Sequence, residues 1–336
     1  MLAGCSVELL RASDPDKELR IAPRLDPNGL VKITKSEDDP NKIIVHFPKV
    51  KINLSKPCSV KYQPFYFDFL DLIVVPGILP NGKVYSIWLD TGDPGYVLTN
   101  SLTILENNLA IYPLGKQGWS SAYAGLCYLS SLQLGQAIIT DPPCRYLHLQ
   151  WEVRLLGLPI WQQKGALVGL GLMQDFGYIV FDNIRKEVAF APTGPFMPEK
   201  PQRWESYSFE IENGRLMVNM PVEDRKSRIM FDTCGRYGMV VALDMWRKLP
   251  EGVRASAKIK KGKFFSGFLG QLSCRKATVR RLKIGSLILT NAEIIILPED
   301  SPYLSTGYSV SMKYFKNNVV VLDFDQGLMW IKKPWS

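Results

Sequence analysis

The sequence predicts an all-β protein with two lobes of the same fold, related by a pseudo-two-fold axis. The 26 glycines and 23 prolines stand among short runs of Val, Ile, Tyr and Phe, which favours strands and turns over long helices. Two apolar runs each end on an aspartate followed by threonine, at Asp90 and Asp232. At 336 residues the chain is long enough for two lobes that each bury a core.

The overall composition is that of a globular protein. Hydrophobic residues make up 46% and charged residues 22%, which excludes a disordered chain, and we find no apolar run near the length of a membrane span. The formal charge is +9, with basic clusters in residues 254–263 and 275–283. These clusters indicate either an acidic partner or a solvated basic face. No nucleic-acid motif accompanies them, so we expect no nucleic-acid partner.

Residues 1–60 are interpreted as an N-terminal tether followed by a β extension. Residues 6–20 are charged and predict a tether or short helix, and residues 21–59 hold short alternating runs typical of two or three strands. Leu2-Ala3-Gly4-Cys5 resembles a bacterial lipobox, in which the cysteine is lipidated. A signal peptide also needs a charged start and an apolar segment, yet four residues precede Cys5. Either the start is truncated or the match is accidental; the first reading predicts a membrane tether and a periplasmic location in the cell envelope.

The first lobe is expected over residues 61–192. A strand-rich run is followed by the turn signal Leu79-Pro80-Asn81-Gly82 and then by the apolar strand that ends at Asp90. A carboxylate at the end of a buried strand is costly unless something compensates it. Taken alone, Asp90 fits an ordinary strand-end turn, for which Asp is suited. The functional interpretation depends on the repeat of this context at Asp232.

Residues 193–202 predict a stiff Pro-rich linker, and residues 203–336 predict the second lobe. The second half repeats the order of the first: strands, a polar turn, and an apolar run ending at Asp232. Further matches pair Leu132–Gln136 with Leu282–Ser286, Met173–Phe176 with Met312–Phe315, and Tyr178–Asp182 with Val319–Asp323. Preserved order with unequal spacing indicates two domains of one fold with loop insertions, rather than a solenoid.

Two aspartates brought together in this way have a specific chemistry. Both cannot ionise easily, so one keeps a proton while the other stays charged, and the pair titrates as a unit. Such a pair polarises a water from one side and protonates a leaving group from the other. This chemistry needs no metal and no cofactor. The chain has six cysteines, none in a C-x-x-C pair, and only two histidines, so a structural zinc site is not expected. The spacing of the cysteines does not determine whether any of them form disulfides.

Asp90-Thr91-Gly92 at a strand end resembles the signature of the pepsin and retropepsin aspartic peptidases. In that family two apolar residues and a glycine follow later in the same domain, a pattern that Leu167-Val168-Gly169 fits. The resemblance covers roughly Tyr62 to Pro334. It implies a bilobal acid-protease fold with β-barrel lobes, like two tandem retropepsin domains, in a monomer with an intramolecular dyad.

The resemblance also implies roles for individual residues. Asp90 and Asp232 would bind the attacking water, and Thr91 and Thr233 would tie the two loops through hydroxyl-to-backbone hydrogen bonds. Gly92 would let the backbone pass close to the carboxylates without a Cβ in the way.

Family members also carry a β-hairpin flap over the cleft. We expect it in Trp119–Gly125, with Tyr123 as the covering aromatic residue, and expect the matching stretch of the second copy in Phe264–Phe268, including Phe265. Ordinary loop packing is the alternative interpretation of these aromatic residues.

Three departures from the family pattern bear on activity. Cys234 stands where the family has glycine, so its side chain could crowd the loop or force a φ that glycine adopts cheaply. Asp93 adds a third carboxylate, which would perturb the pKa values of the dyad unless it points away. The nearest second-copy match to the apolar-apolar-glycine pattern is the more polar Ser305-Thr306-Gly307.

Three functions follow from these observations. The first is an aspartic endopeptidase that hydrolyses peptide bonds of a peptide or protein substrate with a water activated between Asp90 and Asp232. The second is a catalytically impaired relative that binds a peptide or protein partner in its cleft, with Cys234 marking the loss of catalysis. The third is a structural envelope lipoprotein whose N-terminal extension mediates contacts.

Overall fold

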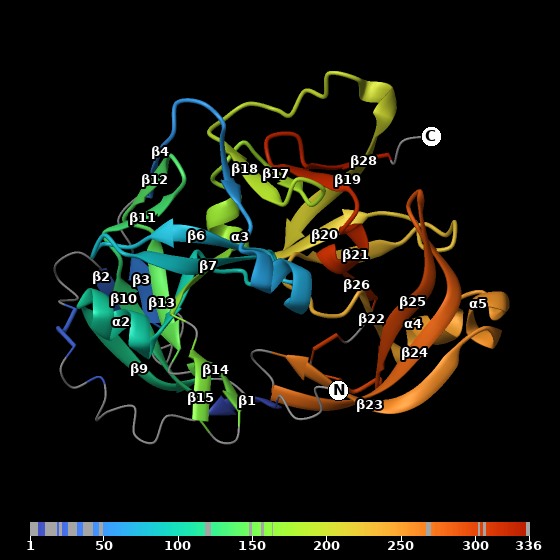
Figure 1. Cartoon of the computed structure of the whole chain (residues 1–336), viewed down its shortest axis with the longest axis horizontal. Coiled ribbons are helices and arrows are strands. Elements are labelled where there is room, and N and C mark those ends of the chain that lie inside the picture. The colour runs from blue at the N-terminus through green and yellow to red at the C-terminus, as the bar shows by residue number, and fades with distance from the viewer. Residues whose placement is uncertain are drawn as a thin grey trace. The chain divides into compact units, whose positions relative to one another are not determined.

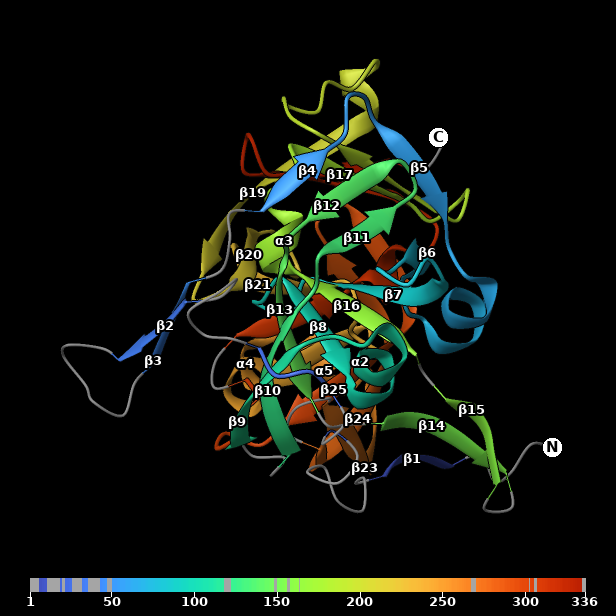
Figure 2. The same ribbon diagram turned by 90° about the vertical axis from the view of Figure 1, so that its left-hand side faces the viewer.

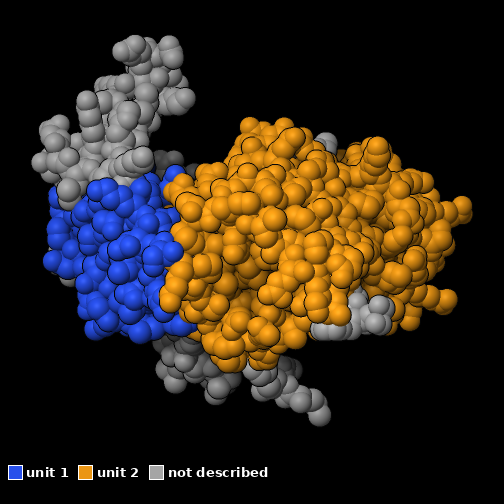
Figure 3. Space-filling view, turned by 90° about the horizontal axis from the view of Figure 1, so that it is seen from above, with its two compact units in different colours: residues 1–55, 75–88, 95–168 blue, residues 56–74, 89–94, 169–336 orange. Residues whose placement is uncertain are grey.

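A computed structural model gives the fold of the chain. It describes residues 6–10, 19, 22–25, 32–35, 43–46, 50–117, 122–147, 150–155, 158–162, 164–266, 270–301, 303–304 and 307–333. Strands account for 52% of the structure and helices for 14%, so the all-β, two-lobe prediction is confirmed. The chain divides into two compact units, coloured separately in Figure 3. Unit 1 comprises residues 1–55, 75–88 and 95–168, and unit 2 comprises residues 56–74, 89–94 and 169–336.

Within its described residues, unit 1 is built on a ten-stranded sheet with the order β4-β12-β11-β6-β7-β16-β8-β13-β10-β9 (Figures 1 and 2). The strands are β4 (Lys51–Asn53), β6 (Val74–Ile78), β7 (Val84–Asp90), β8 (Val97–Asn100), β9 (Ile111–Gln117), β10 (Ala122–Tyr128), β11 (Ser131–Leu134), β12 (Ala137–Thr140), β13 (Pro143–Leu147) and β16 (Gly165–Gly169). Helix α2 (Ser101–Asn107) follows β8 directly, and the Asn100 side chain caps it by accepting from the Thr103 N–H.

The described part of unit 2 holds a thirteen-stranded sheet with the order β23-β24-β25-β22-β26-β21-β20-β19-β28-β27-β17-β18-β5 (Figure 1). Its strands are β5 (Cys58–Lys61), β17 (Tyr178–Asp182), β18 (Glu187–Ala191), β19 (Trp204–Glu212), β20 (Arg215–Asn219), β21 (Arg228–Asp232), β22 (Met239–Ala242), β23 (Lys258–Ser266), β24 (Gly270–Ile284), β25 (Leu287–Leu297), β26 (Tyr308–Ser311), β27 (Val319–Asp323) and β28 (Leu328–Lys332). Its short helices are η2 (Phe65–Phe69), α3 (Leu170–Met173), η3 (Pro201–Arg203), α4 (Leu243–Lys248), α5 (Glu251–Ala255) and η4 (Met312–Phe315).

The internal repeat predicted from the sequence is visible in strand order. The run β6-β7-β16-β8-β13-β10-β9 in the first sheet corresponds to β20-β21-β26-β22-β25-β24-β23 in the second. Strand directions agree as well, because β13 pairs with β8 in parallel as β25 does with β22, while β16 and β26 pair with β8 and β22 antiparallel. Gly135 and Gly285, matched in the sequence, both take a positive φ in the turn of a hairpin.

A second sign of duplication lies in the middle of the unit 2 sheet. The segments β5-β18-β17 and β27-β28-β19 are adjacent, and β17 pairs antiparallel with β27 so that Val180 faces Val321. This pairing joins the matched segments of the two halves about a local two-fold axis. Strands β5, β17 and β18 precede the predicted linker in the sequence but belong to unit 2. The reason is that β17 pairs with β27 of the unit 2 sheet, and β18 and β5 extend the sheet from there.

The N-terminal extension contains more regular structure than the sequence suggested. Ser6–Leu10 forms β1, which pairs antiparallel with β14 (Gln150–Leu155), and β14 pairs with β15 (Leu158–Gln162). Residues 6–10 are therefore a strand, and the short helix considered for residues 6–20 does not include them. The partner strand lies far along the chain, so local sequence gives no sign of it. Strands β2 (Lys32–Lys35) and β3 (Ile43–His46) form a separate hairpin, as expected.

The two basic clusters of the sequence come together in one hairpin. In β23 and β24, Lys260 lies opposite Lys276 and Lys261 lies opposite Arg275. Like charges directly opposite one another destabilise a strand pair. Strand β23 is at the edge of the described sheet, where lysines also discourage pairing with other chains.

Candidate active site

Both predicted aspartates lie at strand ends, and both loops belong to unit 2. Strand β7 ends at Asp90 and strand β21 ends at Asp232. The apolar runs before the aspartates are buried, with Leu89 and Phe231 both 0% exposed. Each buried strand therefore holds the backbone of its aspartate in place. Asp232 is 8% exposed, whereas Asp90 keeps more of its surface accessible.

The two loops are joined by four reciprocal hydrogen bonds. The Thr91 N–H donates to Thr233 Oγ1 at 2.9 Å, and the Thr233 N–H donates to Thr91 Oγ1 at 3.0 Å. Each hydroxyl in turn donates to the strand of the other copy: Thr91 Oγ1 to the Phe231 carbonyl at 2.8 Å and Thr233 Oγ1 to the Leu89 carbonyl at 2.6 Å. Both threonines are 0% exposed. The bonds hold the two loops in one fixed arrangement.

The two carboxylates meet in front of Gly92. They are hydrogen-bonded to each other, and each also accepts from its own loop: Asp90 Oδ1 from the Gly92 N–H at 2.8 Å and Asp232 Oδ1 from the Cys234 N–H at 2.9 Å. A Cβ on Gly92 would lie 3.0 Å from Asp90 Oδ1 and 3.1 Å from Asp232 Cγ. The absence of a side chain at Gly92 therefore leaves room for the carboxylates to approach.

The surroundings of the two carboxylates differ. Burial, followed by the charges of Asp232 and Asp93, raises the pKa of Asp90 well above its usual range. Burial also raises the pKa of Asp232, but the N–H groups of Cys234 and Gly235 and the Tyr303 hydroxyl oppose this by stabilising the charged form. The two carboxylates share one proton and titrate as a pair, and the hydrogen bonds from Cys234, Gly235 and Tyr303 favour the charge on Asp232.

Tyr303 is a site residue that sequence reasoning missed. Its hydroxyl hydrogen-bonds to Asp232 and to Ser309, and its pKa is raised by burial and then by the charge of Asp232. Its ring packs edge-on against Phe264 of β23, with centroids 4.7 Å apart. Tyr303 stands in a polar turn region with no periodic pattern, so the sequence holds no signal of its proximity to Asp232.

Asp93 lies within electrostatic reach of the dyad. It is 1% exposed, and its charge contributes to the raised pKa of Asp90. Its carbonyl accepts from the Leu170 N–H at 2.7 Å, which connects the loop after Asp90 to the start of α3. Gly169, the last residue of the apolar-apolar-glycine pattern, directly precedes Leu170 in an extended conformation.

Cys234 fits into the loop without unusual backbone geometry. It is not among the residues with positive φ, so the position does not require glycine for conformational reasons. Its Sγ lies 3.3 Å from the Leu89 carbonyl, the same oxygen that accepts from Thr233. Burial, then the charges of Asp90 and Asp232, raises the pKa of its thiol well above the usual range. This environment favours the neutral thiol over the thiolate, which is the nucleophilic form of cysteine.

The predicted flap segments fall on hairpins in both copies. Strands β9 and β10 pair antiparallel, with Tyr123 opposite Lys116, and β23 and β24 pair with Phe265 opposite Gln271. Trp119 to Ser121 and the side chains of Tyr123 and Phe265 lie outside the described residues.

The remaining predicted residues are Cys5 and the stretch Ser305-Thr306-Gly307. Cys5, Ser305 and Thr306 also lie outside the described residues, and Gly307 takes a φ of +91° just before β26.

In the part of the chain that the structure describes, no three His, Cys, Asp or Glu side chains are grouped to hold a metal ion. Nor does any helix of that part have the length and apolar character needed to cross a membrane.

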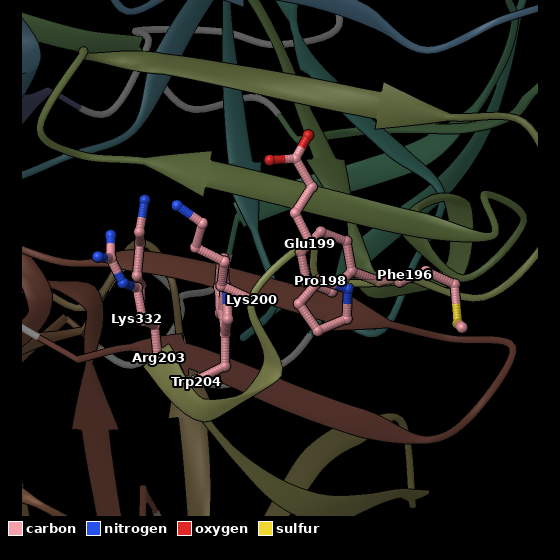
Figure 4. A pocket seen from close by; sticks show the side chains of 8 residues that line it. Phe196, Pro198, Glu199, Lys200, Arg203, Trp204 and Lys332 are labelled. Carbon is pink, nitrogen blue, oxygen red and sulfur yellow. The ribbon is translucent and has the colours of Figure 1, made fainter.

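The predicted linker is anchored to unit 2. Phe196 packs edge-on against Trp204 and Tyr178, with centroids 5.1 and 5.4 Å apart, and its N–H donates to Asp323 at 2.9 Å. A hollow of about 400 Å³ beside it is lined by the linker, Trp204 and Lys332. Figure 4 shows the charged ends of Lys200, Arg203 and Lys332 gathered on one side, with the Glu199 carboxylate pointing away.

No protein-family model matches the chain, and no curated protein sequence matches it. Among solved structures, the fold is similar to that of conglutin gamma, a basic 7S globulin from lupine seeds, at 10% sequence identity. The match covers 85% of this chain and 96% of that chain, with a TM-score of 0.46. A likeness at this level adds nothing about the site, which therefore stands on its own geometry.

Proposed function

We propose that this chain is an aspartic endopeptidase of the pepsin and retropepsin type, acting on an extended peptide or protein segment. One observation supports this above all: the Asp90 and Asp232 carboxylates are hydrogen-bonded to each other on loops joined by reciprocal threonine bonds. A strand-end turn needs neither a second carboxylate nor such a link between the loops. The same arrangement is what a shared-proton dyad requires.

The proposed reaction follows from the different surroundings of the two carboxylates. Ionised Asp232 takes a proton from a water while the water oxygen attacks the peptide carbonyl carbon. Protonated Asp90 gives its proton to the carbonyl oxygen, which forms a neutral tetrahedral diol. The diol collapses when the proton on Asp232 passes to the leaving nitrogen and a diol hydroxyl returns its proton to Asp90. The dyad ends with one proton, as it began.

The test is peptide hydrolysis at acid pH, with a mixture of unstructured peptides and product detection by mass spectrometry. Asp90→Asn and Asp232→Asn should each abolish turnover while the far-ultraviolet circular dichroism spectrum stays that of the wild type. Asp325→Asn, an exposed turn position outside the loops, is the matched control and should retain activity. A statine-type transition-state mimic should inhibit the wild type. Full turnover in either dyad variant would exclude the mechanism.

Cys234 gives one specific reason to keep a second candidate, a catalytically impaired protein that binds peptides. It places a side chain within the loop where the family resemblance implies glycine. The two candidates separate when the statine-type peptide is titrated by calorimetry and turnover is measured on the same sample. Binding without turnover, together with turnover gained in Cys234→Gly, would favour the impaired protein. Turnover in the wild type that Cys234→Gly leaves unchanged would favour the peptidase.

A further inference from the structure

Two cysteines of unit 1 are in direct sulfur contact. Cys127 on β10 lies directly opposite Cys144 on β13 in an antiparallel pair. Both are free thiols in the structure, and the Cys127 thiol donates to Cys144 Sγ at 2.8 Å, which is closer than the roughly 3.5–4.0 Å of ordinary packing contacts. Both side chains are 0% exposed. Antiparallel partners place their Cα atoms about 4.5 or 5.5 Å apart, and both spacings suit a disulfide.

We infer that Cys127 and Cys144 form an intrachain disulfide, made by exchange with a disulfide-bearing oxidant such as an oxidised small thiol or an oxidoreductase. One cysteine thiolate attacks a sulfur of the oxidant and releases the first oxidant thiolate. The second cysteine thiolate then attacks the mixed disulfide, forms the Cys127–Cys144 bond and releases the second thiolate. The two protons of the cysteine thiols end on the two oxidant thiols, so the oxidant is reduced by two electrons.

The exchange takes place while the chain folds. Burial raises the pKa of the Cys127 thiol well above its usual range, so the folded protein offers almost no thiolate to an oxidant. Once formed, the bond is shielded in the same way from attack by an external thiol. Formation of the bond also requires an oxidising folding compartment, because reducing compartments keep such thiols in the reduced form.

The bond has a definite place in the fold. Strand β10 pairs with β9 on one side and with β13 on the other. A covalent bond between β10 and β13 fixes the β9–β10 hairpin to its neighbouring strand β13. Cys127 and Cys144 are 17 positions apart, so the bond closes a short loop that contains the β11–β12 hairpin.

The experiment maps the cysteines of the full-length protein after refolding in a mixture of reduced and oxidised glutathione. The protein is denatured without reductant, alkylated with iodoacetamide, digested and analysed by mass spectrometry. We expect the peptides carrying Cys127 and Cys144 to be joined, and Cys274 to be alkylated. Cys274 is the matched control, because it is also buried but packs in an apolar cluster with Val240, Phe264 and Ile295. Alkylation of both Cys127 and Cys144, or a bond from either to another cysteine, would overturn the inference.

Two further measurements test the shielding and the pairing. The first uses the wild type alone, and the second analyses a variant after denaturation, so neither depends on how well a variant folds. A reductant added to the folded protein should leave the bond intact, and the same reductant should break it after denaturation. Rapid reduction of the folded protein would contradict the shielding. In Cys127→Ala, Cys144 should become alkylated after denaturation while Cys274 is alkylated as before. A Cys144 that stays unalkylated there would show that Cys127 is not its partner.

Discussion

The link between the Asp90 and Asp232 loops can be tested by removing one threonine hydroxyl at a time. Thr91→Val and Thr233→Val each remove two of the four reciprocal hydrogen bonds, and the two variants remove different pairs of bonds. Valine has nearly the shape of threonine, so the cavity contribution is small. Thr233→Val leaves the buried Thr91 N–H without its acceptor and takes one donor from the Leu89 carbonyl. Thr91→Val does the same to the Thr233 N–H and the Phe231 carbonyl.

The magnitude follows from burial. An unsatisfied buried polar group costs about 1–3 kcal/mol, and each variant affects one N–H fully and one carbonyl in part. We therefore expect each variant to lose about 2–4 kcal/mol of unfolding free energy, a large share of the roughly 5–15 kcal/mol of an ordinary domain. The two losses should be similar because the four bonds are reciprocal.

The assay is urea unfolding followed by tryptophan fluorescence, with the free energy of unfolding extrapolated to water. Thr278→Val is the matched control, since this exposed threonine on β24 has no part in the link, and its loss should stay within about 0.5 kcal/mol. Losses as small as the control in either loop variant would refute the reasoning. Peptidase activity should fall in both loop variants, because the carboxylates lose their fixed separation.

Three further predictions follow from the described geometry. The pKa of Asp90 is raised in the folded state, so its contribution to stability is full below its ordinary pKa and is lost as pH rises through the raised value. Asp90→Asn should therefore make the unfolding free energy less dependent on pH, and higher than that of the wild type at neutral pH, in urea titrations from acid to neutral pH. Tyr303→Phe removes a hydroxyl that stabilises ionised Asp232, so kcat/KM should fall roughly 10- to 100-fold and its acid limb should move to higher pH with little change in KM. An unshifted limb would leave Tyr303 with a packing role. Lys261→Glu replaces a repulsive pair with an attractive one opposite Arg275 and should stabilise the protein by about 0.2–1 kcal/mol at low salt, an effect that should fade in high salt.

Sequence reasoning reached the parts of this protein that depend on short segments. The all-β class, the repeat and the two aspartates were all visible, because strand periodicity and turn residues act over a few positions. The Asp-Thr pairs at Asp90 and Asp232 also stood out by repetition. Local pattern was less informative for residues 6–10, which form a strand because β14 pairs with them.

Contacts between distant segments were decided only by the tertiary structure. The sequence showed that Asp90 and Asp232 could form a pair. Only the fold brings the Tyr303 hydroxyl to Asp232 and the Asp93 charge near Asp90, so the two carboxylates have different surroundings. Cysteine spacing likewise left pairing open, until the register of β10 and β13 placed Cys127 opposite Cys144. The physical reason is the same in each case: burial and electrostatic interaction depend on distance in space, which strand pairing sets and residue spacing does not.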